Sequence, residues 1–376
     1  MRRTFALALG VASVLSAAAA PTLVEIGSPV VTERAKSRSY FAAARTAYAL
    51  PGASEYTNTV ITGSASANSN DVPTGVTFAW SGAAEGTCIL EVSDLADFRG
   101  EDTRRERVAG SLATLYNFRA DTDYFWRVTD AAGDRSATGT FRTAAGIRQI
   151  RAGQMRNVRD IGGWTGIRQG LVFRGSAWTF DAGKGETGAS EESVKAFRDT
   201  LGIRSEIDLR GNARTLPEGN VDVEQYGAKR LFLPVDASIS SMFDGERKSY
   251  AGPLRALVDP ANLPAYIHCA GGADRTGAVI FLVEAICGVS DADKSIDYET
   301  TTHAAIYGLR SRTNRTGAST FQYAAAIDRF MADYDGATLN EKVVNYARTT
   351  LGLTDDEIKA IRINLTPSKS AKLVVR

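Results

Sequence analysis

The sequence is poor in histidine and carries almost no net charge. Only His268 and His303 occur in 376 residues, so the chain offers no cluster of imidazole ligands for a metal. Lysine and arginine number 44, against 43 aspartates and glutamates. This even balance provides no broad positive field for nucleic acid or an anionic membrane, so any anion site must be local. We expect no metal, no other cofactor and no nucleic-acid partner.

Cysteine is scarce as well. The three residues Cys88, Cys269 and Cys287 cannot form a disulfide framework in a chain of this size, and at least one thiol must stay free. We expect Cys88 and Cys287 to pack in apolar interiors. A free thiol in an oxidising compartment is a liability unless it has a task, which draws attention to Cys269.

The N-terminus carries an apolar run that is too short to span a membrane. Arg2 and Arg3 precede the run Phe5 to Leu15, and Ala17 to Ala20 supply small residues for a signal peptidase. A spanning helix needs about 20 apolar residues. Residues 1–20 therefore predict a signal peptide, cut after Ala19, and a mature protein exported to the periplasm or secreted. The sequence gives no oligomeric state.

Residues 21–145 are rich in short alternating strands and turn clusters. In the segment from Asp121 to Thr143, Tyr124, Trp126 and Val128 fall on one strand face and a turn follows at Asp130 to Gly133. This segment resembles the closing hairpin of a fibronectin type III-like β-sandwich. The resemblance implies an N-terminal all-β domain.

Residues 146–376 alternate between strand and helix patterns, which predicts an α/β domain whose central sheet is flanked by helices. Ser190 is expected to cap a helix that stops at Gly202, and Thr354 with Glu357 forms a capping box. Gly277 to Ile286 is continuously apolar, which predicts a helix buried on nearly all sides.

The segment from His268 to Gly277 carries the chemistry. An apolar strand runs into a short glycine-bearing loop that an apolar helix leaves, and such a loop turns backbone N–H groups inward as an anion nest. Five residues separate Cys269 from Arg275, whose guanidinium can grip two phosphate oxygens. This environment should lower the pKa of the Cys269 thiol and make it a nucleophile. The remaining predicted cradle residues are Ala270, Gly271, Gly272, Ala273 and Thr276, with Thr276 tuning the thiolate.

This string resembles the signature loop of cysteine-dependent protein tyrosine phosphatases. Residues 157–163, 170–176 and 201–210 look like other parts of a bacterial branch that includes secreted tyrosine and phosphoinositide phosphatases. The resemblance implies hydrolysis through a cysteinyl-phosphate, with His268 orienting the loop. Phosphoinositide phosphatases often carry lysine where this chain has Ala273, so a phosphotyrosyl protein is the expected substrate. A phosphorylated lipid or inositol phosphate stays open as the alternative.

Three aspartates compete to protonate the leaving group. Asp236 lies in a loop 33 residues before Cys269, a spacing that resembles the family's acid. Asp274 lies within the cradle itself, and the resemblance implies a catalytic role for it. Asp208 ends a strand and could support the site. Asp236 and Asp208 could instead fill a cap or a turn.

Two further features leave alternatives open. Gly183 to Gly188 fits a dinucleotide-binding glycine pattern, but no buried strand precedes it, so we expect a loop there. Arg310, Arg312 and Arg315 form either a solvated face or a flank of the cleft that holds an acidic substrate. A protein that binds phosphorylated ligands without turnover is the alternative to an enzyme.

Overall fold

The structure is a computed structural model that describes residues 20–48, 73–179, 189–211, 223–245, 247–304, 308–317 and 320–367. Residues 1–19 of the expected signal peptide and the segment from Gly183 to Gly188 lie outside this range. Within it, no helix is both long and apolar enough to cross a membrane. The chain forms two compact units, which are described separately.

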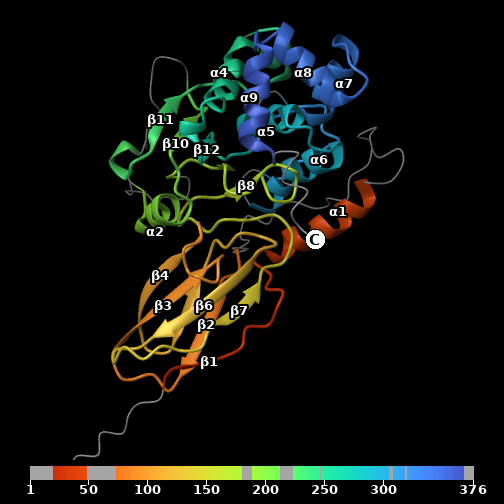
Figure 1. Cartoon of the computed structure of the whole chain (residues 1–376). Helices are drawn as coiled ribbons and strands as arrows, with labels where there is room; N and C mark the ends of the chain where they lie inside the picture. Colours follow the sequence, from red (N-terminus) through yellow and green to blue (C-terminus); the bar gives the residue numbers. More distant parts are fainter. Residues whose placement is uncertain are drawn as a thin grey trace, which may run out of the picture. The chain divides into compact units, whose positions relative to one another are not determined.

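The first unit contains nearly all of two β-sheets (Figure 1). Their orders are β1-β2-β5 and β4-β3-β6-β7. The strands are β1 (Thr22–Leu23), β2 (Val76–Ser81), β3 (Thr87–Ser93), β4 (Arg104–Ala109), β5 (Leu112–Leu115), β6 (Asp123–Thr129) and β7 (Gly139–Arg142). Tyr124, Trp126 and Val128 are all buried, so the predicted alternation along β6 is confirmed. Phe78 of the smaller sheet meets the Trp126 ring of the larger sheet at 5.1 Å, which places aromatic packing between the sheets.

The second unit contains a five-stranded sheet of order β11-β10-β12-β9-β8. Strands β9 to β12 are parallel, while β8 runs antiparallel to β9. Their bounds are β8 (Arg159–Asp160), β9 (Val172–Gly175), β10 (Ser205–Asp208), β11 (Lys229–Phe232) and β12 (Ala265–His268). Together with the helices described next, this sheet confirms the predicted α/β architecture.

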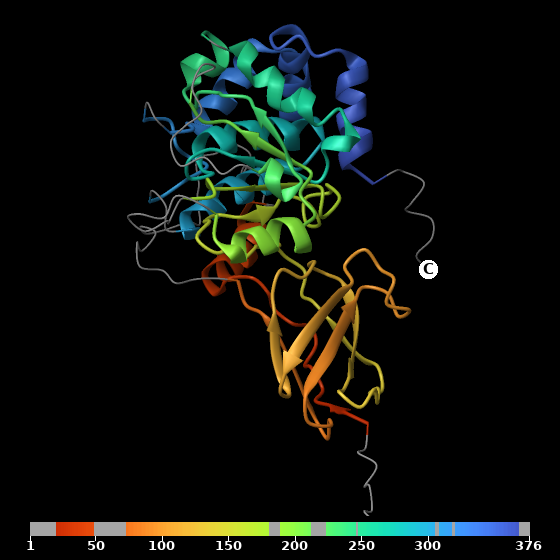
Figure 2. The ribbon, with the colours of Figure 1, turned by 90° about the vertical axis from the view of Figure 1, so that its left-hand side faces the viewer.

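Helices cover both faces of this sheet (Figure 2). Ala265 and Ile267 of β12 face one apolar cluster, and Tyr266 faces another, because side chains alternate along a strand. The helices are α2 (Glu191–Val194, continued by a π-helical turn at Lys195–Thr200), α3 (Ile239–Phe243), α4 (Ala251–Ala256), α5 (Asp274–Ile286), α6 (Asp291–Thr300), α7 (Tyr323–Asp333), α8 (Leu339–Thr349) and α9 (Asp355–Leu365).

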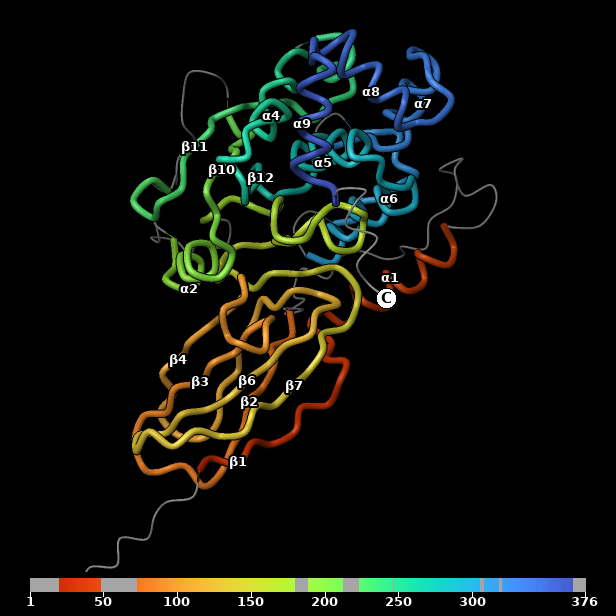
Figure 3. The backbone as a smooth tube through the Cα atoms, viewed as in Figure 1, coloured from red at the N-terminus to blue at the C-terminus, as the bar shows by residue number. Residues whose placement is uncertain are grey.

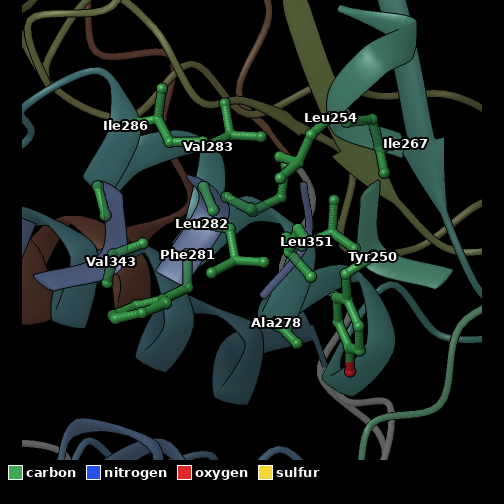
Figure 4. Packing of buried hydrophobic residues seen from close by; sticks show 14 of the residues in the cluster. Tyr250, Leu254, Ile267, Ala278, Phe281, Leu282, Val283, Ile286, Val343 and Leu351 are labelled. Carbon is green, nitrogen blue, oxygen red and sulfur yellow. The ribbon is translucent and has the colours of Figure 1, made fainter. Parts of the chain in front are cut away.

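Helix α5 is the centre of the larger cluster, with α4, α8 and α9 around it (Figure 3). Every residue from Thr276 to Ile286 is buried, which confirms the predicted buried helix. Phe281, Leu282 and Val283 lie among side chains from α4, α8 and β12 (Figure 4). A helix enclosed in this way gives the loop before it a rigid base.

The predicted helix starts are also confirmed. Ser190 accepts a hydrogen bond from the Ser193 N–H, and Thr354 with Glu357 makes both bonds of the capping box. These side chains satisfy N–H groups that the first turn of a helix leaves unpaired.

One helix was not expected. Helix α1 (Ala35–Tyr48) lies within residues that we assigned to the β-rich part, and the compact units do not follow the expected boundary at residue 145. The described residues of the segment 28–76 belong with the second unit, as do residues 115–122. The β-rich unit therefore interrupts the second unit along the sequence.

Candidate active site

The register of the parallel sheet brings four chain segments to one edge. His268, the last residue of β12, pairs with Asp208 of β10 and Gly175 of β9, and Asp208 pairs with Phe232 of β11. The segments that follow these residues therefore leave the sheet at its carboxyl edge, where open α/β sheets bind ligands. The loop from Cys269 is one of them and leads into α5, so the predicted strand–loop–helix context is confirmed.

The loop turns its carbonyl groups outward, toward donors in the surrounding protein. The Gly272 oxygen accepts from Asn157 Nδ2 at 2.9 Å and from Arg174 Nη2 at 2.7 Å. The other acceptor bonds are Cys269 O with His268 Nδ1, Ala270 O with Ala177 N, Gly271 O with Asn157 Nδ2, and Ala273 O with Arg174 Nη2 and Gly277 N. Within the described residues, the N–H groups of Ala270, Gly271 and Ala273 donate to no protein acceptor. These donors are free for an anion.

Gly272 is required by its surroundings. Its φ of +65° lies in the left-handed region, and a Cβ there would stand 2.1 Å from the carbonyl oxygen of Gly175. A side chain would therefore strain the backbone and collide with the end of β9. Glycine at this position therefore permits the turn of the loop.

The electrostatics of the loop favour the thiolate of Cys269. Burial raises the pKa of this thiol, but the Arg275 charge, the Thr276 hydroxyl and the N–H groups of Thr276 and Gly272 outweigh burial. The net pKa lies below its ordinary value, in the predicted direction. The Thr276 hydroxyl is buried and makes no hydrogen bond to oxygen or nitrogen among the described residues. Burial instead raises the pKa of Cys287 to about 12.

Arg275 is the cation left for a ligand at this loop. Its side chain is partly exposed, and among the described carboxylates none forms an ion pair with it. A guanidinium without a carboxylate partner at the start of a helix can grip two oxygens of an anion.

His268 is fully buried between two acceptors. Its Nε2 lies 2.9 Å from Glu206 Oε1, and its Nδ1 lies 3.0 Å from the Cys269 carbonyl. Both partners are acceptors, so this geometry favours the form of His268 in which both ring nitrogens donate. Burial lowers the pKa of His268, but the carboxylates of Asp208 and Glu206 together raise it by more, so the net shift is upward. Arg230 holds Glu206 from the other side at 2.9 Å.

Asp208 forms an ion pair beside the loop. Its buried carboxylate accepts from Arg210 Nη2 at 2.8 Å and from the Arg210 N–H at 3.0 Å. Burial raises the pKa of Asp208, but the charges of His268 and Arg210 bring it below its usual range. Arg210 is a cation that sequence reasoning missed: the negative charge of Cys269 is among the causes that raise its pKa against burial. The signal was its position two residues beyond a strand-end aspartate.

Asp274, the first residue of α5, has both carboxylate oxygens occupied. Arg310 donates to Oδ1 at 2.8 Å and to Oδ2 at 2.7 Å, and the Phe321 N–H donates to Oδ1 at 3.0 Å. In this geometry both carboxylate oxygens of Asp274 act as hydrogen-bond acceptors. Of the other two clustered arginines, Arg312 is buried and Arg315 pairs with Asp328 at the surface. The three arginines therefore do not form a single solvated face.

Asp236 is the exposed member of the three candidate acids. Its Oδ1 accepts from the Ser238 N–H at 3.1 Å and its Oδ2 from Ser241 Oγ at 3.2 Å, in a turn before α3. The Tyr250 hydroxyl donates to its carbonyl oxygen. No described contact joins Asp236 to Cys269. Asp236 thus lies in a turn, as expected if it fills a cap or a turn, and its carboxylate is accessible to solvent.

Four buried residues that support the loop were not assigned a role from the sequence. Arg159 and Arg174 both bind Asp297, and Arg159 donates to the Asn157 side chain. Burial, followed by the charge of Arg174, lowers the pKa of Arg159 to about 10 although Asp297 opposes this. Asn157, Arg159 and Arg174 lie in segments that carry the family resemblance, but only the fold shows that Asn157 and Arg174 reach the Gly272 carbonyl.

The chain was compared with known families, curated proteins and solved structures. The profile of a tyrosine phosphatase family matches residues 150–367, which include the whole cysteine loop. No curated protein matches the chain. The core catalytic domain of the PP-IP phosphatase SIW14 from S. cerevisiae, in complex with citrate, is 16% identical with a TM-score of 0.32, over 48% of this chain and 89% of that one. A second structure of the Siw14 catalytic core is 14% identical with a TM-score of 0.32, over 55% and 98%.

Proposed function

The chain belongs to the tyrosine phosphatase family, and on that premise we propose that it hydrolyses phosphotyrosyl proteins through a phosphocysteine intermediate on Cys269. The observation that carries the proposal is the outward orientation of the loop carbonyls, which leaves N–H donors around a thiol of lowered pKa. Such donors stabilise the charge of a transferring phosphoryl group without having to reorganise.

The reaction has two displacements at phosphorus. The Cys269 thiolate attacks, the S–P bond forms, and the ester O–P bond breaks as a proton reaches the leaving oxygen. Water then attacks the phosphocysteine, the S–P bond breaks, and the thiolate returns as inorganic phosphate leaves. Arg275 holds two phosphoryl oxygens in both steps, and Thr276 stabilises the thiolate whenever it is free.

We assign the general acid to Asp236. The carboxylates of Asp274 and Asp208 each receive a two-pronged guanidinium, from Arg310 and Arg210, and a group held in this way is stabilised as the anion. Among the described residues, the donors to the Asp236 carboxylate are a hydroxyl and an amide, and its side chain is exposed. Asp274 then acts by positioning, and Asp208 by holding Arg210.

A single phosphate on an aromatic ring fits the available charge. Ala273 adds no cation to the loop, and Arg210 and Arg310 are each committed to a carboxylate. Arg275, in the loop itself, forms no ion pair with a described carboxylate. A phosphoinositide or inositol phosphate, with several phosphates, is the second candidate because both committed arginines stand close to the loop.

The test compares substrates on one reduced sample of the mature protein. Turnover of p-nitrophenyl phosphate, a phosphotyrosyl peptide and phosphatidylinositol phosphates is measured beside a Cys269→Ser variant. We expect the peptide to be preferred and all turnover to vanish in the variant. Preference for the lipids would overturn the substrate assignment. No turnover with a titratable free thiol would leave a phosphate-binding module.

We also propose that the β-rich unit is a fibronectin type III-like module and that the protein is exported by a bacterial cell, into the periplasm or beyond. Support comes from the division of the strands into sheets of three and four and from the n-region, apolar run and alanines of residues 1–20. N-terminal sequencing of protein recovered from the periplasm and the medium should begin at Ala20. An intact N-terminus on cytoplasmic protein would contradict export.

A further inference from the structure

Helix α1, which lies in sequence between β1 and β2 of the β-rich unit, packs against α6 of the catalytic unit. Its buried residues Tyr40, Ala44 and Tyr48 recur every four positions and so form one face. They lie in an apolar cluster with Ile147, Trp164 and Ile296. The α1 segment is therefore integrated into the catalytic unit.

One buried carboxylate joins α1 to a distant segment. Glu299 Oε2 accepts from the hydroxyls of Tyr40 at 2.6 Å and Tyr48 at 2.5 Å, and Glu299 Oε1 accepts from the Arg312 N–H at 2.7 Å. The Arg312 guanidinium lies 3.9 Å over the Tyr48 ring. Glu299 is fully buried, so these donors fix where the backbone at Arg312 runs.

The segment that contains Arg312 also contains Arg310, which forms an ion pair with Asp274 at the end of the loop that binds the phosphate. Thr302 Oγ1 accepts from the Arg310 N–H at 2.8 Å and donates to the Arg310 carbonyl at 3.0 Å. Arg310, 6% exposed, then grips both oxygens of Asp274 beside Arg275. If Arg310 moved away, Asp274 would keep the Phe321 N–H as a donor, but its negative charge would stand without a cation at the loop that receives the phosphate.

We propose that Glu299 is a positioning residue that ties helix α1 to the Arg310–Asp274 pair and thereby keeps the phosphate cradle free of an unpaired negative charge. The connection consists of the hydrogen bonds from Tyr40 and Tyr48 to Glu299, the hydrogen bond from the Arg312 N–H to Glu299, and the short backbone segment from Arg312 to Arg310. The inference rests on the proposed anion site and needs no turnover. Its test is therefore the affinity for inorganic phosphate, which remains measurable if the hydrolase assignment fails.

The experiment is calorimetric titration of inorganic phosphate into the full chain. Glu299→Leu removes both acceptors, and we expect roughly tenfold weaker binding, the effect of an unpaired like charge across a partly screened site. Glu299→Gln should stay close to wild type, because its carbonyl can accept from Arg312 N–H while the tyrosine hydroxyls accept from its amide. Arg45→Ala removes a different α1 anchor, the 3.2 Å pair with Asp293, and should bind phosphate normally.

A second background separates positioning from general stability. In Asp274→Asn the charge that Arg310 neutralises is gone, so adding Glu299→Leu should weaken phosphate binding no further. An equal loss in both backgrounds would overturn the proposal, as would unchanged affinity in Glu299→Leu. If that variant does not fold, Tyr40→Phe with Tyr48→Phe replaces it in the same comparison, with a several-fold loss expected only when Asp274 is present.

Discussion

Removing the Thr276 hydroxyl should make Cys269 a less acidic thiol without opening a large cavity. The hydroxyl is buried and is one of the groups that lower the pKa of Cys269. A hydrogen bond to a charged group contributes about 1.5–3 kcal/mol. Since about 1.4 kcal/mol is a factor of ten in an equilibrium, Thr276→Ala should reduce the thiolate fraction roughly tenfold to a hundredfold at a pH well below the midpoint.

The assay is the rate of alkylation of Cys269 by iodoacetamide across pH, followed by mass spectrometry. In wild type the midpoint lies below that of an ordinary thiol, and in Thr276→Ala it moves up. Thr276→Ser keeps the donor and serves as the matched control. Hydrolysis of the phosphocysteine should also slow in the alanine variant, because a more basic thiolate is a poorer leaving group. An unchanged alkylation midpoint in Thr276→Ala would refute the role of the hydroxyl.

Three other outcomes follow from the same geometry. Gly272→Ala should abolish phosphate binding in calorimetry, because a Cβ would lie 2.1 Å from Gly175 O at a φ of +65°; retained affinity would show that the loop can adjust. Asp236→Asn should lower kcat for a phosphotyrosyl peptide by about 10²–10⁴-fold, the usual contribution of a general acid. The loss should be smaller with p-nitrophenyl phosphate, because its leaving group is more acidic and needs less protonation. Equal losses with both substrates would contradict the assignment of Asp236. At neutral pH iodoacetamide should label Cys269 and spare Cys287, whose pKa is about 12; labelling of both at similar rates would contradict the difference in environment.

The features that the sequence could predict are those fixed by neighbours in the chain. The strand, loop and helix around Cys269 follow from an apolar run, two glycines and a second apolar run within about twenty residues, and the caps at Ser190 and Thr354 follow from residues three positions away. The family resemblance extended this local information to the whole catalytic region. These are positions where local preference and the final fold agree.

The parts that could not be predicted depend on distant partners. Asn157 and Arg174 reach the Gly272 carbonyl across about a hundred residues, and Tyr40 reaches Glu299 across 259. Helix α1 was missed because alanines, serines and charged residues give it only a narrow apolar face, and because the strands that follow it belong to another compact unit. Only the fold shows which buried surface that narrow face covers.

The candidate acids show why residue type and spacing cannot assign a proton. Asp208, Asp236 and Asp274 are equivalent in chemistry, and for each a family pattern or a strand end predicts a position near Cys269. The difference between them is the donor that each one faces. A guanidinium at both oxygens of Asp208 and Asp274 stabilises the anion, whereas the serine and amide donors at Asp236 carry no charge. Arg210 and Arg310, which pair with two of the aspartates, also have their charge neutralised by those carboxylates. The proposed choice of acid and the proposed preference for one phosphate therefore rest on the same two ion pairs.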